Sequence, residues 1–454
     1  MNAPKPIPTA SLCPICLRRV AARRETDGVD GYIVKDCPEH GEFRTRFWHG
    51  PPGMAGWNRP KVPGAPPPVL TESRLGCPHD CGLCPDHAQR TCTALFEITG
   101  RCNLACPVCF ARAGETPPPD PTVAALADRF ARIFAATGPV NVQLSGGEPT
   151  VRADLPNVVA ACRAAGFAFI QVNTNGLALA RDPGLARRLA DAGLVSVFLQ
   201  FDGTTDDVFA TLRGAPLLAE KLAAIDRCVA AGLGVVLVPT IVPGVNDGQL
   251  GDIIRLARSK APGVRGVHFQ PASSFGRYPW ESGAGERVTL PDLMRGLEVQ
   301  TDGMIRAEDF HPPGCEHSLC SFSQPYLLTG EAGLTPAAGQ AASCCSPTPA
   351  PPIAADEGAR RAKGFVARQW AAPTFPPKEG GPMDDFDRFL ADAATSRRFT
   401  ISAMAFQDAW TLDLERTRGC CIHVATADNR LVPFCLYNLT ATDGTTLHRG
   451  QPCA

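Results

Sequence analysis

Three cysteines with short, regular spacing carry the clearest chemistry in this sequence. They lie in Arg101-Cys-Asn-Leu-Ala-Cys-Pro-Val-Cys-Phe110, directly after an apolar stretch at 95–98. The spacing C-x3-C-x2-C lets Cys102, Cys106 and Cys109 hold three irons of a [4Fe–4S] cube and leaves the fourth iron without a protein ligand. That iron can bind a small molecule, so the cluster could take part directly in a reaction instead of only transferring electrons. A zinc knuckle that lacks one ligand is the alternative interpretation.

A second motif, Leu144-Ser-Gly-Gly-Glu-Pro149, follows the apolar stretch at 140–144. Glycine pairs alone mark many turns, but a cysteine triad after one strand and GGEP after the next is specific. This combination resembles the radical S-adenosylmethionine (SAM) enzymes. The resemblance implies that the amine and carboxylate of SAM bind the open iron. It also implies that Gly146 and Gly147 let the backbone approach the methionyl group and that Glu148, followed by Pro149, lies near the SAM ammonium.

Between about 95 and 270 the sequence alternates strand-like and helix-like stretches. The strand-like segments are 95–98, 140–144, 167–173, 195–201, 233–240 and 264–270. Ala-, Leu- and Arg-rich stretches at helical spacing lie between them, as at 122–136 and 185–192. Such alternation predicts βαβ units and a parallel sheet. We therefore expect an α/β fold, and the resemblance implies the partial (β/α)6 barrel of radical SAM enzymes.

Polar residues follow the ends of these predicted strands. Sites on parallel α/β folds lie at the carboxyl ends of the strands. Asn175 lies in Asn173-Thr-Asn-Gly176, and Gln270 ends the last strand. We expect both side chains to line the cofactor cavity with the GGEP turn, although Asn-Gly pairs are also ordinary turns.

A separate set of residues near the N-terminus has the spacing of a tetrahedral metal site. Cys13-Pro-Ile-Cys16 is followed by Cys37-Pro-Glu-His-Gly41. A C-x2-C and a C-x2-H knuckle together can hold one zinc or iron ion. We expect Cys13, Cys16 and Cys37 to bind this ion, with His40 as the candidate fourth ligand. Closed sites of this kind usually stabilise the fold.

A second group, Gly76-Cys-Pro-His-Asp-Cys-Gly-Leu-Cys-Pro85, repeats the C-x3-C-x2-C spacing. Cys77, Cys81 and Cys84 could be joined by Cys92 to make a four-thiolate set. A fully ligated cube has no free iron, so this group would transfer electrons. A competing interpretation makes this triad the SAM cluster, but the strand-like stretch that follows it, at 95–98, does not end in a GGE motif.

A third group is split between two distant segments. Cys315 and Cys320 lie in Pro313-Gly-Cys-Glu-His-Ser-Leu-Cys320. The adjacent Cys420 and Cys421, and Cys435, come over a hundred residues later. One of the adjacent pair, with Cys315, Cys320 and Cys435, could hold a second auxiliary cluster that fastens the C-terminal region to the barrel. Free buried thiols are the alternative interpretation.

The order of these motifs resembles a narrower family. A Cys-Pro-x-Cys head, a Gly-Cys-Pro-x-Asp-Cys arm and the barrel precede a tail with Phe406-Gln-Asp-Ala-Trp-Thr-Leu-Asp-Leu-Glu-Arg416 and Pro433-Phe-Cys-Leu-Tyr-Asn438. This order is similar to class D radical SAM methyltransferases, including tetraether lipid synthases and archaeal dihydropterin methyltransferase-like proteins. The resemblance implies a SAM-binding [4Fe–4S] cluster, two auxiliary [4Fe–4S] clusters and a rubredoxin-like mononuclear iron or zinc. It also favours Cys421 over Cys420 as a ligand.

The motifs divide the chain into four regions. We expect an N-terminal rubredoxin- or zinc-ribbon-like module at 1–70, an auxiliary-cluster arm at 71–93, the barrel at 94–290 and a C-terminal auxiliary-cluster region at 291–454. A Pro/Ala/Ser-rich stretch at 335–382 is predicted to be a long loop or linker. It contains Cys344 and Cys345, to which we assign no role.

Composition excludes several other classes of protein. The 454 residues include 44 basic and 45 acidic side chains, so the net charge of −1 offers no basic surface for nucleic acid. No apolar run reaches the length of a transmembrane helix, and the N-terminus has no apolar signal core. We therefore expect a cytoplasmic protein, whose twenty cysteines mostly bind metal.

The resemblance to radical SAM enzymes implies an enzyme that cleaves SAM reductively to a 5′-deoxyadenosyl radical. The family resemblance implies C–C bond formation on a small-molecule or lipid substrate, by methyl transfer or carbon–carbon coupling. A flavodoxin or ferredoxin would supply the electron. The alternatives are a radical SAM oxidoreductase or peptide-modifying maturase and, in another class, an iron–sulfur electron-transfer protein without SAM chemistry.

Overall fold

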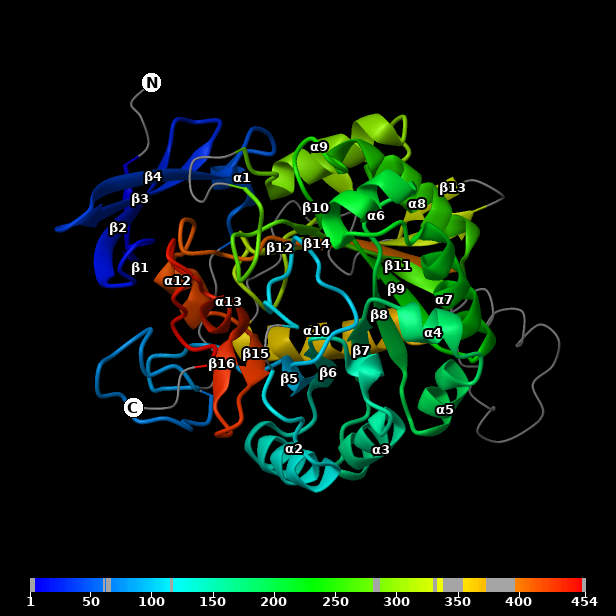
Figure 1. The fold of residues 1–454 in the computed structure, drawn as a ribbon. Helices are drawn as coiled ribbons and strands as arrows, with labels where there is room; N and C mark the ends of the chain where they lie inside the picture. Colours follow the sequence, from blue (N-terminus) through cyan, green and yellow to red (C-terminus); the bar gives the residue numbers. More distant parts are fainter. Residues whose placement is uncertain are drawn as a thin grey trace.

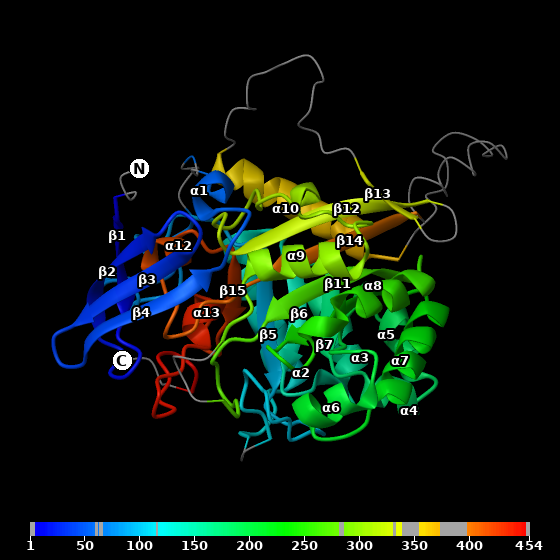
Figure 2. The same ribbon diagram turned by 90° about the horizontal axis from the view of Figure 1, so that it is seen from above.

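The computed structural model describes most of the chain as two β-sheets with their helices. The described residues are 5–59, 62, 67–114, 117–280, 286–329, 333–337, 354–372 and 397–450. Cys344 and Cys345 lie outside them. Figures 1 and 2 show a small N-terminal sheet beside a larger, curved sheet with helices on its outer face.

The N-terminal sheet is an antiparallel meander of four strands. It contains β1 (Ile7–Leu12), β2 (Arg19–Thr26), β3 (Gly31–Cys37) and β4 (Gly41–Trp48) in sequence order. The two predicted metal knuckles are the turns that connect β1 to β2 and β3 to β4. The first and third turns of a meander lie at the same end of the sheet, so the two knuckles come together there.

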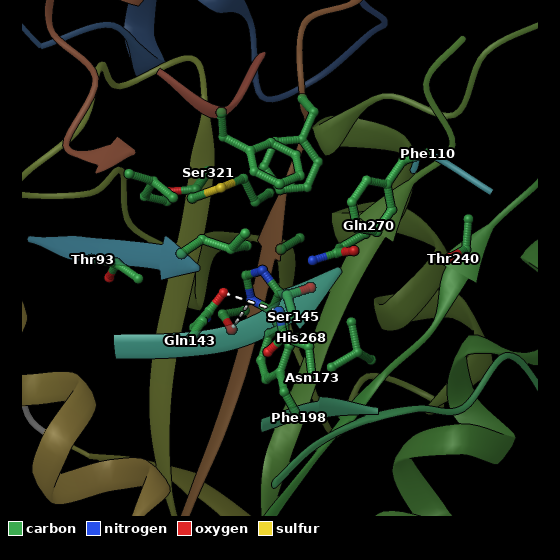
Figure 3. A pocket seen from close by; sticks show the side chains of 18 of the residues that line it. Thr93, Phe110, Gln143, Ser145, Asn173, Phe198, Thr240, His268, Gln270 and Ser321 are labelled. Carbon is green, nitrogen blue, oxygen red and sulfur yellow. Dashed lines mark hydrogen bonds between the residues drawn. The ribbon is translucent and has the colours of Figure 1, made fainter. Parts of the chain in front are cut away.

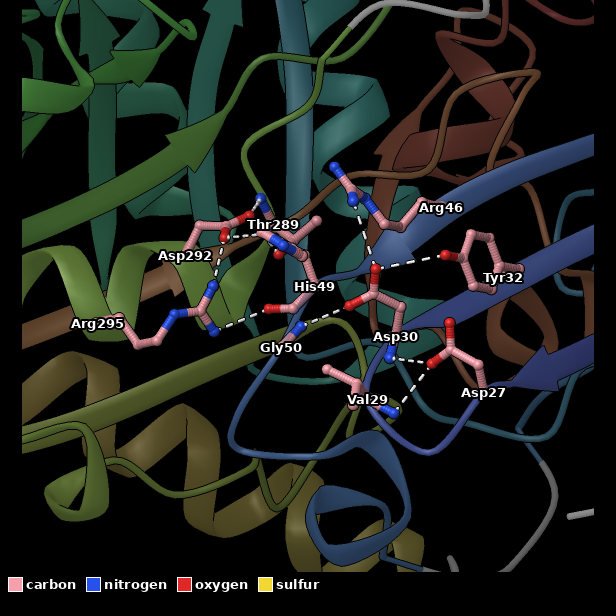
Figure 4. A network of polar contacts seen from close by, with 10 residues as sticks. All are labelled: Asp27, Val29, Asp30, Tyr32, Arg46, His49, Gly50, Thr289, Asp292 and Arg295. Atoms are coloured by element: carbon pink, nitrogen blue, oxygen red, sulfur yellow. Dashed lines mark hydrogen bonds and ion pairs between the residues drawn. The ribbon is translucent and has the colours of Figure 1, made fainter. Parts of the chain in front are cut away.

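Polar contacts fasten the N-terminal sheet to helix α9 (Leu290–Gln300) of the barrel (Figure 4). The imidazole Nδ1 of His49 lies 2.7 Å from a carboxylate oxygen of Asp292. Arg295 donates a hydrogen bond of 2.8 Å to the carbonyl of His49. The carboxylate of Asp30 accepts from the amide of Gly50 at 2.8 Å, which orients the segment that leaves the sheet.

The larger sheet contains the six predicted parallel strands in their predicted order. They are β5 (Thr93–Thr99), β6 (Asn141–Gly146), β7 (Ile170–Thr174), β8 (Ser196–Gln200), β9 (Gly234–Val238) and β11 (Val264–Pro271). The helices that connect them are α2 (Val123–Thr137), α3 (Leu155–Ala164), α4 (Leu177–Arg181), α5 (Leu185–Asp191), α6 (Asp206–Arg213), α7 (Leu218–Ala230) and α8 (Leu250–Ser259). This arrangement confirms the predicted parallel α/β barrel.

The C-terminal region extends this sheet at both edges, which the sequence did not predict. Strand β14 (Arg398–Met404) pairs in parallel with β11, and β12 (Ser321–Thr329) and β13 (Gly333–Pro336) follow it in antiparallel order. At the other edge β15 (Ile422–Ala425) pairs in parallel with β5, and β16 (Leu431–Pro433) pairs with β15. Pairing both edges protects them from association with other chains. The short helices α12 (Leu414–Arg418) and α13 (Phe434–Tyr437) flank β15 and β16 in the chain.

Helix α10 (Ala355–Trp370) lies within the stretch that we predicted to be a linker. That prediction is wrong for these sixteen residues, because an Ala- and Arg-rich segment of good helix formers interrupts the proline-rich sequence. The Trp370 ring packs against Phe198 with ring centroids 5.3 Å apart, in a cluster that includes Val236 and Val238. Trp370 thus attaches α10 to the barrel strands.

We predict that Trp370→Ala loosens α10. Truncation of a buried aromatic side chain destabilises its packing by about 3 kcal/mol. Where α10 opens locally, this loss should speed the exchange of its amide hydrogens on the order of 100-fold. Hydrogen–deuterium exchange mass spectrometry of the full chain measures this change. Val299→Ala, at a side chain that is 75% exposed on α9, should leave α10 exchange unchanged. Equal exchange in the two variants would contradict the packing role of Trp370.

Candidate functional site

The three cysteines of the first motif lie on a cavity of about 560 Å³ inside the barrel. Cys102, Cys106 and Cys109 occupy the loop after β5, and all three line this cavity. Arg277, beyond β11, fixes the loop: its Nε donates to the carbonyl of Cys106 at 2.8 Å, and its carbonyl accepts from the amide of Cys109 at 2.8 Å. The loop is therefore held between the first and last strands of the predicted six.

The two glycines of GGEP allow a close backbone contact with the cysteine loop. Gly146 has φ of +126°, and a Cβ there would lie 2.1 Å from the carbonyl oxygen of Thr99. A Cβ on Gly147 would lie 2.2 Å from the carbonyl oxygen of Arg101. Both distances are far below contact distance, so only glycine fits at these positions. Both glycines also line the cavity beside the triad, so neither position places a side chain between the backbone and a ligand.

Glu148 is 1% exposed, and protein donors hold its carboxylate. One oxygen accepts from the Thr150 amide at 3.0 Å and the Thr174 hydroxyl at 2.7 Å. The other accepts from the Asn175 amide at 2.6 Å. The carboxylate thus joins the end of β6 to the end of β7, and it also lines the cavity. Pro149 is buried and begins the short 3-10 helix after this turn.

Asn175 connects the end of β7 to the cysteine loop. Its Nδ2 donates to Oδ1 of Asn103 at 2.7 Å, and Asn103 is the neighbour of Cys102. The buried Lys221 of α7 donates to the carbonyl of Asn175 at 2.6 Å and to Gln200 at 2.7 Å. Burial lowers the pKa of Lys221 to about 8. Lys221 was not identified from the sequence, because a single lysine in an amphipathic helix gives no signal of its own.

A buried ion pair supports the other side of the cysteine loop. The guanidinium of Arg213 donates to both carboxylate oxygens of Asp202 at 2.6 and 2.8 Å, and to the carbonyl of Val108 at 2.8 Å. Arg213 lines the cavity, whereas Asp202 is fully buried. Asp202 comes just after β8, and Arg213 ends α6. No sequence pattern indicated this pair, because their contact depends on how α6 returns to β8.

Polar side chains and aromatic rings line the rest of the cavity (Figure 3). Gln143 accepts a hydrogen bond of 3.2 Å from Asn173, and the Oδ1 of Asn173 is buried without a partner. His268 contacts the Phe198 ring at a centroid distance of 5.4 Å and lies 2.8 Å from the Ser402 hydroxyl. Gln270 lines the cavity, as predicted from its position at a strand end. Burial lowers the pKa of His268 to about 4, so this imidazole is neutral at pH 7.

The electrostatics of the triad depend on its burial. Burial raises the pKa of the Cys102 thiol to about 11, and it also raises that of Cys106. Metal binding requires the thiolate, so binding would displace these protons. Three thiolates beside a bare glycine backbone fit the [4Fe–4S] cluster and SAM that the motifs imply. When bound, this pair of cofactors supplies reductive cleavage of SAM.

The structure brings the N-terminal knuckles together. The ligand atoms of Cys13, Cys16, Cys37 and His40 all lie within 4.8 Å of one another. The Nδ1 of His40 lies 3.6 Å from the Cys13 sulfur and 3.4 Å from the Cys37 sulfur. Three sulfurs and one nitrogen at these separations suit one tetrahedral ion.

Cys92 does not lie where the sequence suggested. Its sulfur, with those of Cys315 and Cys421, forms a second group within 4.8 Å, so it does not complete the set of the auxiliary-cluster arm. The pairing of β15 with β5 explains the error, because it places Cys421 beside Cys92 in space and could not be read from the sequence. All three residues are buried.

The other three cysteines of the arm, Cys77, Cys81 and Cys84, affect one another's pKa values. Cys77 and Cys81 share a hydrogen bond that lowers the pKa of Cys77 to about 7 and raises that of Cys81. The charge of Cys77 also contributes to a raised pKa of Cys84, which is mainly due to burial. These three thiols remain a candidate cluster site.

The predicted set of Cys315, Cys320, Cys421 and Cys435 is divided in the structure. Cys315 and Cys421 lie with Cys92. Cys320 and Cys435 lie near Cys420: burial raises the Cys420 pKa, and the charges of both thiols raise it further. Arg416 donates to the Cys320 sulfur at 3.3 Å. The adjacent cysteines therefore lie near different thiols: Cys421 lies with Cys92 and Cys315, and Cys420 lies near Cys320 and Cys435.

We predict that Cys37→Ala removes one metal ion per chain, because three remaining ligands cannot close a tetrahedral site. His40→Cys should retain the ion, since four thiolates also form such a site. Mass spectrometry of metal content measures both outcomes, and Cys228→Ala in α7 serves as the buried-cysteine control. Equal metal content in Cys37→Ala and the control would contradict this assignment.

Removal of Arg213 should destabilise the cysteine loop. Arg213→Met leaves the Asp202 carboxylate buried without its partner, at a cost of about 3–5 kcal/mol. We expect a lower thermal midpoint and a lower iron content. The double variant Asp202→Asn/Arg213→Met should recover part of the stability, because no unpaired charge remains. A double variant as unstable as the single one would show that the ion pair is not the cause.

No helix in the described ranges is long and apolar enough to cross a membrane.

Comparisons with known proteins agree with this geometry. Residues 96–257 match the radical SAM superfamily, and residues 7–49 match the HMPTM N-terminal zinc ribbon domain. A 7,8-dihydro-6-hydroxymethylpterin dimethyltransferase from Methanocaldococcus jannaschii is 33% identical over 98% of this chain and 94% of its own length.

Other relatives match only part of the chain. A GTP 3′,8-cyclase from Edwardsiella ictaluri is 36% identical over 53% of this chain and 70% of its own. Among solved structures, Streptococcus suis SuiB bound to S-adenosylmethionine has a TM-score of 0.41 and 16% identity, over 48% of each chain. The near full-length match, the triad and the glycine cradle lead to one conclusion: the chain belongs to the radical SAM superfamily, in the family of the 7,8-dihydro-6-hydroxymethylpterin dimethyltransferase.

Proposed function

We propose that this radical SAM enzyme forms a C–C bond by transferring methyl groups to carbon atoms of a pterin-type small molecule. The similarity to the dimethyltransferase over 98% of the chain carries the proposal. It favours methyl transfer over carbon–carbon coupling, and a small heterocycle over a lipid.

The cavity supports a flat, polar substrate. Its volume of about 560 Å³ lies in the ordinary range for small-molecule sites. The rings of Phe198, His268 and Trp370 offer an apolar wall on which a ring could stack. The amide groups of Gln143 and Asn173 offer donors and acceptors to the edge of a pterin, and the unpartnered Oδ1 of Asn173 lacks one hydrogen bond that a ligand could supply.

The residues of the chain have distinct roles in this proposal. Cys102, Cys106 and Cys109 hold the cluster, and the Gly146–Gly147 backbone admits SAM beside it. At the SAM end of the cavity, Glu148 and Asn175 hold the turns in place. Gln270 lines the cavity there. A flavodoxin or ferredoxin supplies the electron, and Cys77, Cys81 and Cys84 hold an auxiliary cluster. We place the protein in the cytoplasm, where such reductants are present.

Production of the chain in a bacterial host that makes folate tests this function, because the host supplies pterins, one-carbon donors and a reductant. We expect pterins that carry one or two additional methyl groups, detected by mass spectrometry of cell extracts. The Cys102→Ala variant should give none. The purified enzyme with dithionite and SAM should form 5′-deoxyadenosine. Formation of 5′-deoxyadenosine without any methylated pterin in the cells would contradict the pterin substrate.

A further inference from the structure

His268 presents one imidazole nitrogen to the cavity without a protein partner. The residue lines the cavity, and its Nε2 has no hydrogen-bond partner in the described ranges. This nitrogen is not among the fully buried atoms that lack a partner, so it is accessible from the cavity. We propose that Nε2 carries the ring proton and donates a hydrogen bond to a carbonyl oxygen of the substrate, which makes His268 a specificity-determining residue. This inference rests on the proposed function and deepens it, because it names the substrate atom that the protein selects.

Strand pairing fixes the position of the His268 side chain. Strand β11 pairs in parallel with β14, and His268 lies opposite Ser402 in this register. The two backbones are in close contact beside this pair, since a Cβ on Gly266 would lie 2.1 Å from the carbonyl oxygen of Thr400. Both His268 and Ser402 line the cavity, and the Ser402 hydroxyl lies 2.8 Å from Nδ1. The pairing therefore holds the hydroxyl against one side of the imidazole.

This hydroxyl determines which ring nitrogen carries the proton. Nδ1 of His268 is the one hydrogen-bond partner of the Ser402 hydroxyl among the residues that the structure describes. A buried hydroxyl donates its proton where it finds an acceptor, so Ser402 donates and Nδ1 accepts. Because burial lowers the pKa of His268 to about 4, the ring is neutral at pH 7 and has a single proton. That proton is therefore on Nε2.

Two aromatic rings hold the imidazole in this orientation. The ring centroids of Phe198 and Trp370 lie 5.4 and 5.9 Å from that of His268. The end of α10 that carries Trp370 is itself attached to β11, because the Nε of Arg265 donates to the carbonyl of Gln369 at 3.0 Å. His268 is only 8% exposed, so these contacts leave its ring little room to turn. The direction of the Nε2 donor is thus set before a substrate binds.

The depth of His268 in the barrel places this donor beside the substrate. Gln270 lies two residues nearer the carboxyl end of β11, the end at which the cysteine triad and the GGEP turn also line the cavity. Two residues of a strand span about 7 Å, so His268 lies one layer of side chains deeper than Gln270. SAM held beside the triad leaves this deeper layer to the substrate.

A pterin offers the acceptor that this nitrogen needs. Its ring system carries a carbonyl oxygen at C4, next to a ring N–H. A donor that packing holds in place selects that oxygen, because a substrate group that also donates would leave two buried donors without an acceptor. The flat ring system could stack on Trp370 or Phe198 at the same time. His268 would thus distinguish a 4-oxo ring from a ring with an amino group at the same position.

Nitrogen-15 NMR tests the donor without any assumption about the substrate. The holoenzyme is prepared anaerobically with ¹⁵N-labelled histidine, and the His268 signals are those that disappear in His268→Phe. We expect a protonated Nε2 and an unprotonated Nδ1 at pH 7. Ser402→Ala removes the hydroxyl, so both tautomers should be populated, whereas Ser402→Thr should retain the wild-type pattern. A proton on Nδ1 in the wild-type protein would overturn the proposal.

Binding of two pteridines tests the contact with the substrate. The probes are 7,8-dihydro-6-hydroxymethylpterin and its 4-amino analogue, titrated calorimetrically into the holoenzyme with SAM but without reductant, so that no turnover occurs. We expect the wild-type protein to bind the 4-oxo compound tighter on the order of 100-fold, because the analogue leaves buried donors unpaired. His268→Phe removes the donor and should bind the two compounds with nearly equal affinity. His268→Gln should also lose the preference, since a carboxamide can donate or accept.

Phe198→Leu is the matched control, because it removes a ring that contacts His268 but no polar group. It should weaken both compounds alike and preserve the preference for the 4-oxo ring. An equal preference in the wild-type protein and in His268→Phe would overturn the contact. If cells with the wild-type chain methylate pterins in that case, the proposed function stands and only the role of His268 is wrong. If neither compound binds to the wild-type protein and cells make no methylated pterin, the proposed function fails and the pterin contact fails with it.

Discussion

The close contact between the cysteine loop and the GGEP turn is the constraint on which the rest of this site depends. The carbonyls of Thr99 and Arg101 lie where side chains on Gly146 and Gly147 would otherwise be. This contact fixes the position of the cysteine triad relative to the end of β6. Glu148 extends this fixed point to β7 through its bonds to Thr174 and Asn175. The first three strands of the barrel thus share one rigid rim.

Buried charged side chains hold the loops of this rim from the opposite side. The Arg213–Asp202 pair and the buried Lys221 bind backbone carbonyls of the cysteine loop and of the β7 turn. Charged groups are costly to bury unless each has partners, and here the partners are the loops that position the cofactor. The folding free energy and the geometry of the site are therefore coupled through the same few residues.

Local patterns in the sequence predicted much of the fold and the central site. Strand periodicity and the spacing of the cysteines are local signals, so the six parallel strands and the N-terminal knuckles were predicted from them. The partners of Cys92 were not, because they depend on strand pairing over more than three hundred residues. Helix α10 was missed because proline-rich neighbours hid its composition. Arg213 and Lys221 were missed because single charged residues on helices give no pattern until the helices are placed.

One measurement tests the central claim most directly: electron–nuclear double resonance of the reduced wild-type protein with SAM labelled with ¹⁵N at its amino group. If the cube on Cys102, Cys106 and Cys109 offers its fourth iron to SAM, a ¹⁵N hyperfine coupling will arise from that iron and disappear in the Cys102→Ala variant. A spectrum without that coupling, in a protein shown to bind SAM, would mean that SAM does not ligate the cluster.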